Sequence, residues 1–212
     1  MVTTSRSRPE RVRPPSVKDR ILESAIEEFA GLGYHGSSLR SIAERSRATK
    51  PMIYYHYQGK DGLFAAAIRH QLERLEEELR SRIDDEGDTL ARLEAFARTY
   101  MACFLFDHPA LAVGLRELPT LPAPVFEEIA RDHGRMVVAV LKQILRDGEE
   151  RGDLRQLDID NCTRAIIGVM HYYIRGSGLV AQGAVEAATS QIVDYYAVGM
   201  LTVKQLSRRN GR

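Results

Sequence analysis

Residues 39–57 have the sequence LRSIAERSRATKPMIYYHY. The spacing of apolar residues predicts a short helix from Leu39 to about Arg45, a three-residue turn over 46–48, and a second short helix capped by Thr49. Pro51 lies in the first turn of the second helix, where its missing N–H costs little. Ala43 is small enough for two steeply crossing helices to approach each other. The stretch therefore predicts a helix-turn-helix, with either Met52 or Ile53 facing inward.

The second helix of this motif presents hydroxyl, cationic, aromatic and imidazole groups outward. Such groups suit a surface that enters the DNA major groove and contacts the flanking phosphates. An alternative interpretation is that the tyrosines only pack the small domain. We favour that interpretation for Tyr57, disfavour it for Tyr54 and leave it open for Tyr55. The expected recognition face comprises Thr49, Lys50, Pro51, Tyr54, Tyr55 and His56.

Helical periodicity continues on both sides of this motif, and strand alternation is nearly absent. Ser16 and Asp19 form a predicted capping box for a helix over Val17–Leu32, which Gly33 ends. A longer helix follows from Lys60 to about Ile83. Further helices are expected at about 89–106, 109–118, 123–151, 158–180 and 185–207. The prediction is an all-α protein of nine helices, three short ones in front of six others.

Three segments follow from this pattern. Residues 1–15 form an expected flexible basic arm, 16–60 a three-helix helix-turn-helix domain, and 61–207 a six-helix domain. The arm either enters an adjacent minor groove or only solubilises the chain, and the second interpretation is favoured. The arginines concerned are Arg6, Arg8, Arg11 and Arg13.

Charge is distributed unevenly along the 212 residues. Residues 1–60 carry eleven Lys and Arg against six Asp and Glu, whereas the remainder carries nineteen against twenty-three. A locally basic end is expected when one small module binds a polyanion. The 44% hydrophobic and 28% charged residues are typical of a folded globular protein. No apolar run approaches the roughly 18 residues that span a bilayer, and the basic N-terminus lacks the apolar stretch of a secretory signal. We expect a cytoplasmic protein in which Cys103 and Cys162 are free thiols, and the alternative is a single disulfide between them.

Residues 17–68 resemble the TetR family of bacterial regulators in four places. The family pattern has Phe-x-x-x-Gly-Tyr, then Ile-Ala, then Tyr-Tyr-His-Phe, then Lys-x-x-Leu. This sequence has FAGLGY at 29–34, IA at 42–43, YYHY at 54–57 and KDGL at 60–63. It departs from the family in the turn, where Arg47 replaces a glycine, and at Pro51, which replaces a glycine or another small residue. The motif thus identifies the helix expected to enter the major groove, but it does not identify the operator sequence.

The resemblance implies a homodimer that places two recognition helices on a palindromic double-stranded DNA operator. It also implies a repressor whose C-terminal domain binds a small-molecule effector. The family pattern is carried over residue by residue. Ser37 or Ser38 would cap the helix that begins at Leu39 and contact a DNA phosphate, and Lys60 would contact another DNA phosphate. The expected DNA contacts are Ser37, Ser38, Arg40, Arg47, Thr49, Lys50, Pro51, Tyr54, Tyr55, His56 and Lys60.

Apolar residues of the C-terminal domain could line a ligand cavity between helices, with a few polar groups among them. Arg116 and His171 are flanked by apolar residues, and a cation there would suit an acidic ligand. Glu117, His133, Asn161 and Arg175 are further polar candidates. All of them can also be surface or capping residues. The expected pocket comprises Phe96, Tyr100, Cys103, Phe104, Leu115, Arg116, Met136, Val140, Ile167, Met170 and His171.

The last two predicted helices carry an apolar stripe wider than one face needs. Such a stripe indicates burial on two sides, one against the core and one against a partner subunit. The alternative is a core within one chain. The expected dimer interface comprises Ala165, Val169, Tyr172, Ala188, Ile192, Tyr195, Tyr196, Gly199 and Val203.

Three other functions would each require features of their own. The sequence lacks the common nucleophile, phosphate-binding and dinucleotide motifs, and no two histidines lie four residues apart, so no enzyme, cofactor or zinc site is expected. A regulator with a closed core, controlled by a protein partner, would lack a cavity. An architectural DNA binder would need a basic surface well beyond residues 1–60.

Overall fold

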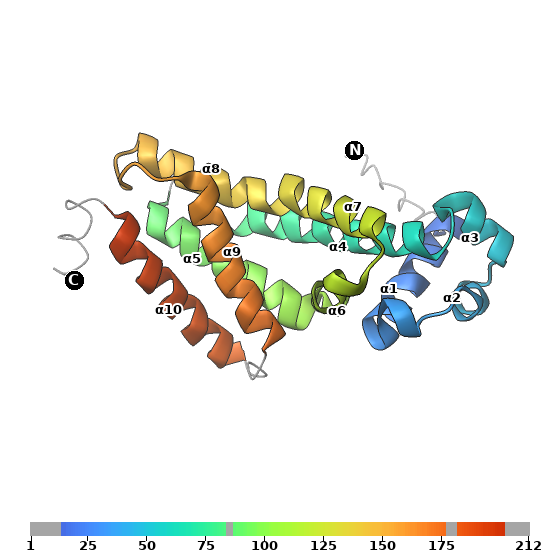
Figure 1. The fold of residues 1–212 in the computed structure, drawn as a ribbon. Helices are drawn as coiled ribbons and strands as arrows, with labels where there is room; N and C mark the ends of the chain where they lie inside the picture. The colour runs from blue at the N-terminus through green and yellow to red at the C-terminus, as the bar shows by residue number, and fades with distance from the viewer. Residues whose placement is uncertain (1–13, 84–86, 177–181, 202–212) are drawn as a thin grey trace, which may run out of the picture.

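The computed structural model describes residues 14–83, 87–176 and 182–201 (Figure 1). Within these ranges the chain is helical, and the one β-type contact is an isolated bridge between Leu154 and Leu201. The all-α prediction is therefore confirmed. The helices are α1 (Val17–Gly36), α2 (Leu39–Ser46), α3 (Lys50–Tyr57), α4 (Lys60–Arg82), α5 (Thr89–Ala102), α6 (Pro109–Glu117), α7 (Ala123–His133), α8 (Ala139–Glu150), α9 (Ile159–Arg175) and α10 (Gln182–Met200).

Side-chain caps begin the first helices where the sequence predicts them. Ser16 and Asp19 form the predicted capping box of α1. Ser38 caps α2 by accepting a hydrogen bond from the Ser41 N–H at 3.1 Å. The first helix does not stop at Leu32, because one further helical turn follows Gly33 and ends at Gly36. Gly33 has φ +71° and ψ 179°, so it kinks the chain between these two parts.

Two expected helices contain π-turns that periodicity does not reveal. The helix predicted over 89–106 changes to the π-turn η1 (Cys103–Asp107) after α5. The helix predicted over 123–151 contains the π-turn η3 (Gly134–Val138) between α7 and α8. A π-turn adds one residue to a turn, so the apolar spacing on either side still fits a helix. The short 3-10 turn η2 (Leu118–Thr120) follows α6. The expected ends at 180 and 207 lie outside the described residues.

The helices α1, α2 and α3 form a small bundle at one end of the molecule, and α4 leads from it into the larger domain (Figure 1). In the figure α7 and α8 follow one side of α4, while α5 and α6 lie on the other. The bundle contacts the larger domain directly, since α1 packs against both α4 and α6. The rings of Phe29 and Tyr34 lie against Phe64 of α4, with centroids 4.9 and 5.1 Å apart. One apolar core therefore continues from the bundle into the larger domain.

Among the described helices, none combines the length and apolar character needed to cross a membrane.

Candidate DNA-binding face and ligand cavity

The turn between α2 and α3 depends on a left-handed residue. Arg47 has φ 53° and ψ 40°, a conformation that glycine adopts more easily than arginine. The Ala48 N–H donates to the Ala43 carbonyl at 2.9 Å, which closes the turn. Thr49 follows as the N-cap of α3 but makes no side-chain capping hydrogen bond. Its hydroxyl is therefore available to another partner.

Most of the predicted recognition face lies at the surface of α2, the turn and α3. Tyr54 and Tyr55 are 58% and 83% exposed. Ile53 is the inward residue and Met52 is 41% exposed, so Met52 adds an apolar group to the face. Tyr57 is buried and its hydroxyl donates to the Lys18 carbonyl at 2.9 Å, which confirms its packing role. The other exposed predicted residues are Ser38, Arg40, Arg47, Thr49, Lys50 and Pro51.

Three residues predicted to contact DNA are buried or half-buried in the structure. Ser37 is buried and donates to the Gly33 carbonyl, so Ser38 alone caps α2. Lys60 is half-buried because its Nζ lies 4.8 Å from the centroid of the Tyr34 ring. His56 is also half-buried, since the C-terminal turn of α3 carries it toward α4. Sequence periodicity did not separate these positions from the exposed ones, because Ser37 precedes α2, Lys60 begins α4 and His56 lies in the last turn of α3.

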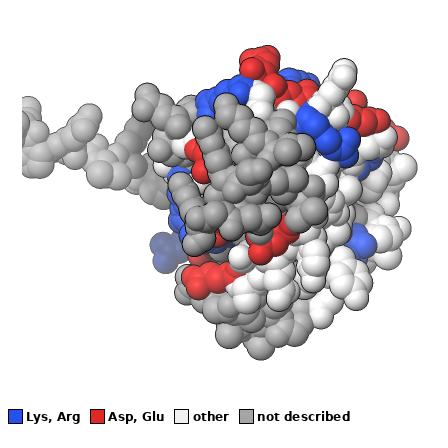
Figure 2. Space-filling model, turned by 90° about the vertical axis from the view of Figure 1, so that its left-hand side faces the viewer, with Lys and Arg blue, Asp and Glu red and all other residues white. Residues whose placement is uncertain are grey.

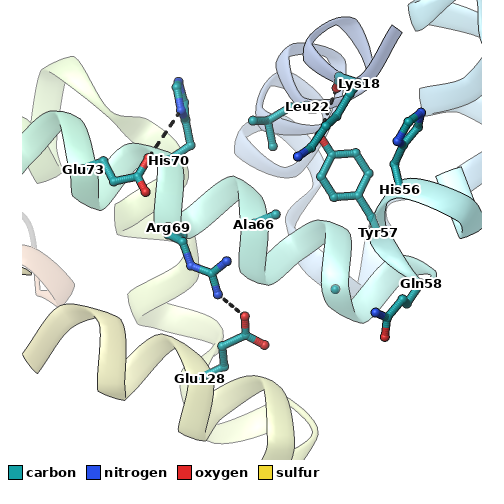
Figure 3. Close-up of a pocket in the computed structure, with 11 residues that line it drawn as sticks. Lys18, Leu22, His56, Tyr57, Gln58, Ala66, Arg69, His70, Glu73 and Glu128 are labelled. Atoms are coloured by element: carbon teal, nitrogen blue, oxygen red, sulfur yellow. Dashed lines mark hydrogen bonds and ion pairs between the residues drawn. The ribbon is translucent and has the colours of Figure 1, made fainter. Parts of the chain in front are cut away.

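His56 borders a polar cleft of about 370 Å³ between the small bundle and the larger domain (Figure 3). Side chains from α1, α3, α4 and α7 line this cleft. Arg69 of α4 forms ion pairs across it with Glu128 and Asp132 of α7, the latter at 2.7 Å. These pairs raise the pKa of Arg69 further. The contact connects α4 with α7 beside the C-terminal end of α3.

A second connection joins α6 to α1. Glu117, the last residue of α6, accepts a hydrogen bond from the Tyr34 backbone N–H at 2.5 Å. A Cβ atom at Gly33 would lie 2.3 Å from the Glu117 Oε1 atom, so a side chain there would force this carboxylate to shift. His35 and Thr120 add a side-chain contact, with Nε2 and Oγ1 3.1 Å apart. The small bundle is thus held at the end of α6.

The larger domain contains an apolar cavity of about 220 Å³. It lies between α4, the segment from η1 to η2, α7 and α9. Phe104, Leu115 and His171 of the predicted pocket line it, as does His133, one of the further polar candidates. The full lining is Ile68, Leu72, Phe104, Leu111, Gly114, Leu115, Leu118, Phe126, Ile129, Ala130, His133 and His171.

Two imidazoles form the polar part of this cavity, and both contact Tyr100. The Tyr100 hydroxyl oxygen lies 3.0 Å from Nε2 of His133 and 2.6 Å from Nε2 of His171. Burial is the main cause that lowers the pKa of each histidine to about 4, and for His171 the neighbouring His133 and Arg175 contribute to the shift. Both rings are therefore neutral near pH 7.

The shared hydroxyl fixes the tautomers of these two rings. A tyrosine hydroxyl has one proton to donate, so it donates to one Nε2 and accepts from the other. One histidine then carries its proton on Nδ1 and its partner does not. Within the described part of the chain, neither Nδ1 atom of His133 or His171 has a hydrogen-bond partner. Together the pair offers one donor and one acceptor.

The predicted pocket was wrong for Arg116, which is exposed. Leu111, Leu115 and Leu118 share the face of α6 and η2 that borders the cavity, and the next position after Leu115 is turned about 100° away from it. No cation of the described chain lines the cavity. The other predicted residues are buried core side chains outside the lining, namely Phe96, Tyr100, Cys103, Met136, Val140, Ile167 and Met170. Ile68 and Leu72 of α4 line the cavity but were not among the predicted pocket residues.

The predicted dimer face divides into two sets. Tyr172 of α9 and Tyr195 of α10 are 76% and 78% exposed, and Ala165 and Gly199 are exposed with them. Val169 and Tyr196 are half-buried. Ala188 and Ile192 are buried, and since α10 packs on α5, they belong to the core of one chain. Val203 lies outside the described residues.

Figure 2 shows the end of the larger domain that is farthest from α3. Lys and Arg side chains alternate there with Asp and Glu side chains, and part of the described surface is uncharged. Extensive phosphate binding needs a continuous basic surface. On this face the described residues do not provide the basic surface that an architectural DNA binder would need.

Comparison with known proteins agrees with this geometry. The family model described as bacterial regulatory proteins, tetR family, matches residues 21–67, which cover α1 to the start of α4. A second family model, the tetracyclin repressor-like C-terminal domain, matches residues 86–175.

Curated relatives and solved structures point the same way. The transcriptional repressor SCO4008 of Streptomyces coelicolor is 33% identical over 66% of this chain and 68% of its own length. The transcriptional activator FasR of Mycolicibacterium smegmatis is 27% identical over 55% of this chain and 60% of its own length. The crystal structure of FadR from Bacillus subtilis, at 19% identity, superimposes with a TM-score of 0.72 over 82% of this chain and 95% of that chain. The chain belongs to the TetR family of DNA-binding transcriptional regulators.

Proposed function

We propose that this regulator is a cytoplasmic homodimeric repressor that leaves a palindromic operator when a compact, largely apolar ligand enters the cavity. The observation that carries the proposal is the position of α6. One face of α6 lines the cavity through Leu111 and Leu115, and its last residue, Glu117, holds the α1 backbone. A ligand that displaces α6 would therefore displace the small bundle. It can do so only if it binds one arrangement more tightly than the other.

The chemistry of the cavity favours a ligand with a neutral polar group. A carboxylate without a cationic partner would be costly to bury among apolar side chains. His133 and His171 together offer one donor and one acceptor, which suits a hydroxyl, an amide or a protonated acid. The acidic ligand expected from Arg116 loses its support, because that side chain is at the surface.

The size of the cavity favours a small ligand. Its volume of about 220 Å³ lies below the roughly 300–1,000 Å³ of pockets that hold drug-sized molecules. The FadR structure was determined in complex with stearoyl-CoA, but at 19% identity it supports only the fold. We therefore assign the ligand class from the cavity and not from that relative.

The second candidate is a regulator with a closed core that responds to a protein partner. The cavity in the larger domain speaks against it, because a filled core would leave no such space. Repression is proposed by analogy with SCO4008, while FasR, a named activator, sets the opposite expectation. Transcription from the operator with and without the protein decides between these directions.

The DNA-binding part is tested by footprinting purified protein on genomic fragments. We expect two protected half-sites about 34–36 Å apart, related by inversion. Lys50→Ala and Tyr54→Ala should each weaken operator binding by about 1–3 kcal/mol. Gln143→Ala, an exposed position on α8, is the control and should bind like the wild type. Unchanged affinity of both α3 variants would refute the assignment of the recognition face.

The ligand part is tested by native mass spectrometry, which reports the dimer and any retained small molecule together. Ala130 lines the cavity but is itself exposed, so it lies where the cavity meets the surface. Ala130→Phe should obstruct the cavity while leaving α3 and operator binding intact. We expect this variant to retain no ligand and to stay on the operator. A variant that still releases the operator in response to a wild-type effector would contradict the cavity as the effector site.

A further inference from the structure

A cluster of three potential metal ligands lies outside both the recognition face and the lining of the cavity. Glu78 of α4, Cys103 of η1 and His108 before α6 place one carboxylate oxygen, one sulfur and one ring nitrogen within 4.8 Å of one another. The Glu78 Oε1 atom lies 3.1 Å from the His108 Nε2 atom, and Oε2 lies 3.4 Å from the Cys103 Sγ atom. Cys103 and His108 are 0% and 2% exposed.

The backbone between Cys103 and His108 is what brings their side chains together. In an α-helix, residues five apart point about 140° away from each other. Here the His108 N–H donates to the Cys103 carbonyl at 2.7 Å, which is the hydrogen bond of a π-turn. The wider turn brings both side chains to the side that faces Glu78. π-turns occur often at functional sites, where they re-aim side chains.

Pro109 fixes the second end of this turn. It begins α6 and restricts the residue before it, so His108 adopts φ −130° and ψ 68° instead of a helical conformation. The α4 side of the cluster is held by Arg82, whose Nη2 lies 3.2 Å from the Glu78 Oε2 atom. Arg82 is 55% exposed and pairs with Oε2, whereas Oε1 is the oxygen that lies beside His108.

The donor set and its spacing fit a borderline transition metal such as Zn²⁺. Oxygen ligands alone suit Ca²⁺ and Mg²⁺, whereas a mixture of sulfur, nitrogen and oxygen suits Zn²⁺. Zinc bonds of about 2.0–2.3 Å in a tetrahedron separate neighbouring ligand atoms by about 3.2–3.6 Å. The separation of 3.1 Å between Glu78 Oε1 and His108 Nε2 is close to that range. The 3.4 Å to the Cys103 sulfur is measured from the other oxygen, Oε2, and the three donor atoms as a set lie within 4.8 Å, so the cluster would contract slightly around an ion.

We propose that Glu78, Cys103 and His108 form a three-ligand binding site for a Zn²⁺-class ion. A water molecule or a small ligand completes the tetrahedron. The Cys103 thiol loses its proton to solvent as the metal–sulfur bond forms, so each bound ion releases one proton. Coordination joins α4 to the turn that precedes α6. This inference is independent of the organic ligand proposed for the cavity.

Cobalt(II) is a suitable probe, because a tetrahedral cobalt–thiolate centre absorbs in the near ultraviolet and the visible. Full-length protein is stripped with a chelator, dialysed and titrated with CoCl₂, and Zn²⁺ is then added as competitor. We expect one Co²⁺ per chain, a thiolate charge-transfer band, and loss of that band as Zn²⁺ displaces cobalt. The absence of a saturable cobalt spectrum would overturn the proposal.

Variants identify the ligands. Cys103→Ser should abolish the charge-transfer band, and Glu78→Gln and His108→Gln should each weaken Zn²⁺ binding by about tenfold or more. Cys162→Ser is the matched control, because Cys162 is a half-buried thiol on α9 outside the cluster, and it should retain the full band. Glu78→Gln keeps a hydrogen-bond acceptor for His108, so it separates loss of the ligand from loss of the fold. A band that survives Cys103→Ser, or disappears in Cys162→Ser, would place the metal elsewhere.

Discussion

Tyr100 and its two histidines form a polar group inside an otherwise apolar domain, and this has a measurable cost in acid. The folded state holds both rings neutral down to about pH 4, whereas in the unfolded chain they take up protons below about pH 6.5. The unfolded state therefore binds more protons between these values. The contribution of these two rings to the free energy of unfolding is therefore fully present above pH 6.5 and is lost as the pH drops toward 4.

Chemical denaturation at a series of pH values tests this dependence. Each ring should account for up to about 3 kcal/mol of the loss between pH 6.5 and 4. His133→Gln with His171→Gln should flatten that part of the curve. An equally steep loss in the double variant would show that carboxylates elsewhere cause it.

The stability of the fold also depends on the backbone conformation of Gly33. Its φ of +71° is unfavourable for any L side chain, and a Cβ atom would meet the Glu117 carboxylate. Gly33→Ala should lower the free energy of unfolding by about 1–3 kcal/mol and weaken the contact between α1 and α6. Gly31→Ala is the control, since Gly31 is exposed in α1 and has nothing within 4 Å of an added Cβ. Thermal unfolding should show that the control is at least as stable as the wild type.

At the scale of elements, the turn between α2 and α3 places a charged residue in a conformation that lowers the stability of the fold. Arg47 adopts a left-handed conformation that glycine adopts at lower cost, and its side chain is exposed beside α3. Arg47→Gly should raise the free energy of unfolding by about 0.5–1 kcal/mol. The same change should weaken operator binding and reduce its salt dependence by about one phosphate contact.

Denaturation and fluorescence anisotropy over a range of salt concentrations check the two halves of this prediction. Arg47→Asn separates them, because asparagine tolerates the left-handed conformation yet carries no charge. A glycine variant that is less stable than the wild type would contradict the strain. An unchanged salt dependence would remove Arg47 from the DNA contacts.

The helices themselves could be predicted because their apolar spacing and caps are local properties. Ser16 with Asp19, and Ser38 before α2, act on backbone groups within a few residues. The π-turn at Cys103 could not be predicted, because the same spacing fits a plain helix. Arg116 was misplaced for a related reason, since its apolar neighbours in sequence lie on a face of α6 from which it is turned away.

For the whole molecule, the wide apolar stripe on the last two helices indicated burial on two sides. It could not show which of its residues belong to the core and which are exposed. Ile192 and Tyr195 lie three residues apart on α10, yet one packs toward α5 and the other is 78% exposed. Which side of α10 faces α5 depends on contacts far apart in sequence. The proximity of Glu78, Cys103 and His108 could not be predicted for the same reason, since 25 residues separate the first two side chains.

The exposed tyrosines give a test of the dimer. If α9 and α10 form the partner contact, Tyr172→Arg with Tyr195→Arg should give a monomer in sedimentation equilibrium. Because each monomer would hold only one half-site, operator affinity should fall by about 100-fold or more. Gln143→Arg adds the same charge to an exposed position of α8 and should remain dimeric. A double variant that stays dimeric would place the interface on another face.

The hydrogen bond between Glu117 and the Tyr34 backbone has a consequence for how related sequences can diverge. Because the carboxylate binds an N–H that nearly every residue has, position 34 can change without removing this bond. Position 33 has no such freedom while an acidic side chain occupies position 117. Across relatives, the two should therefore change together: a lineage that loses the glycine should also lose the carboxylate, and with it the contact between α1 and α6.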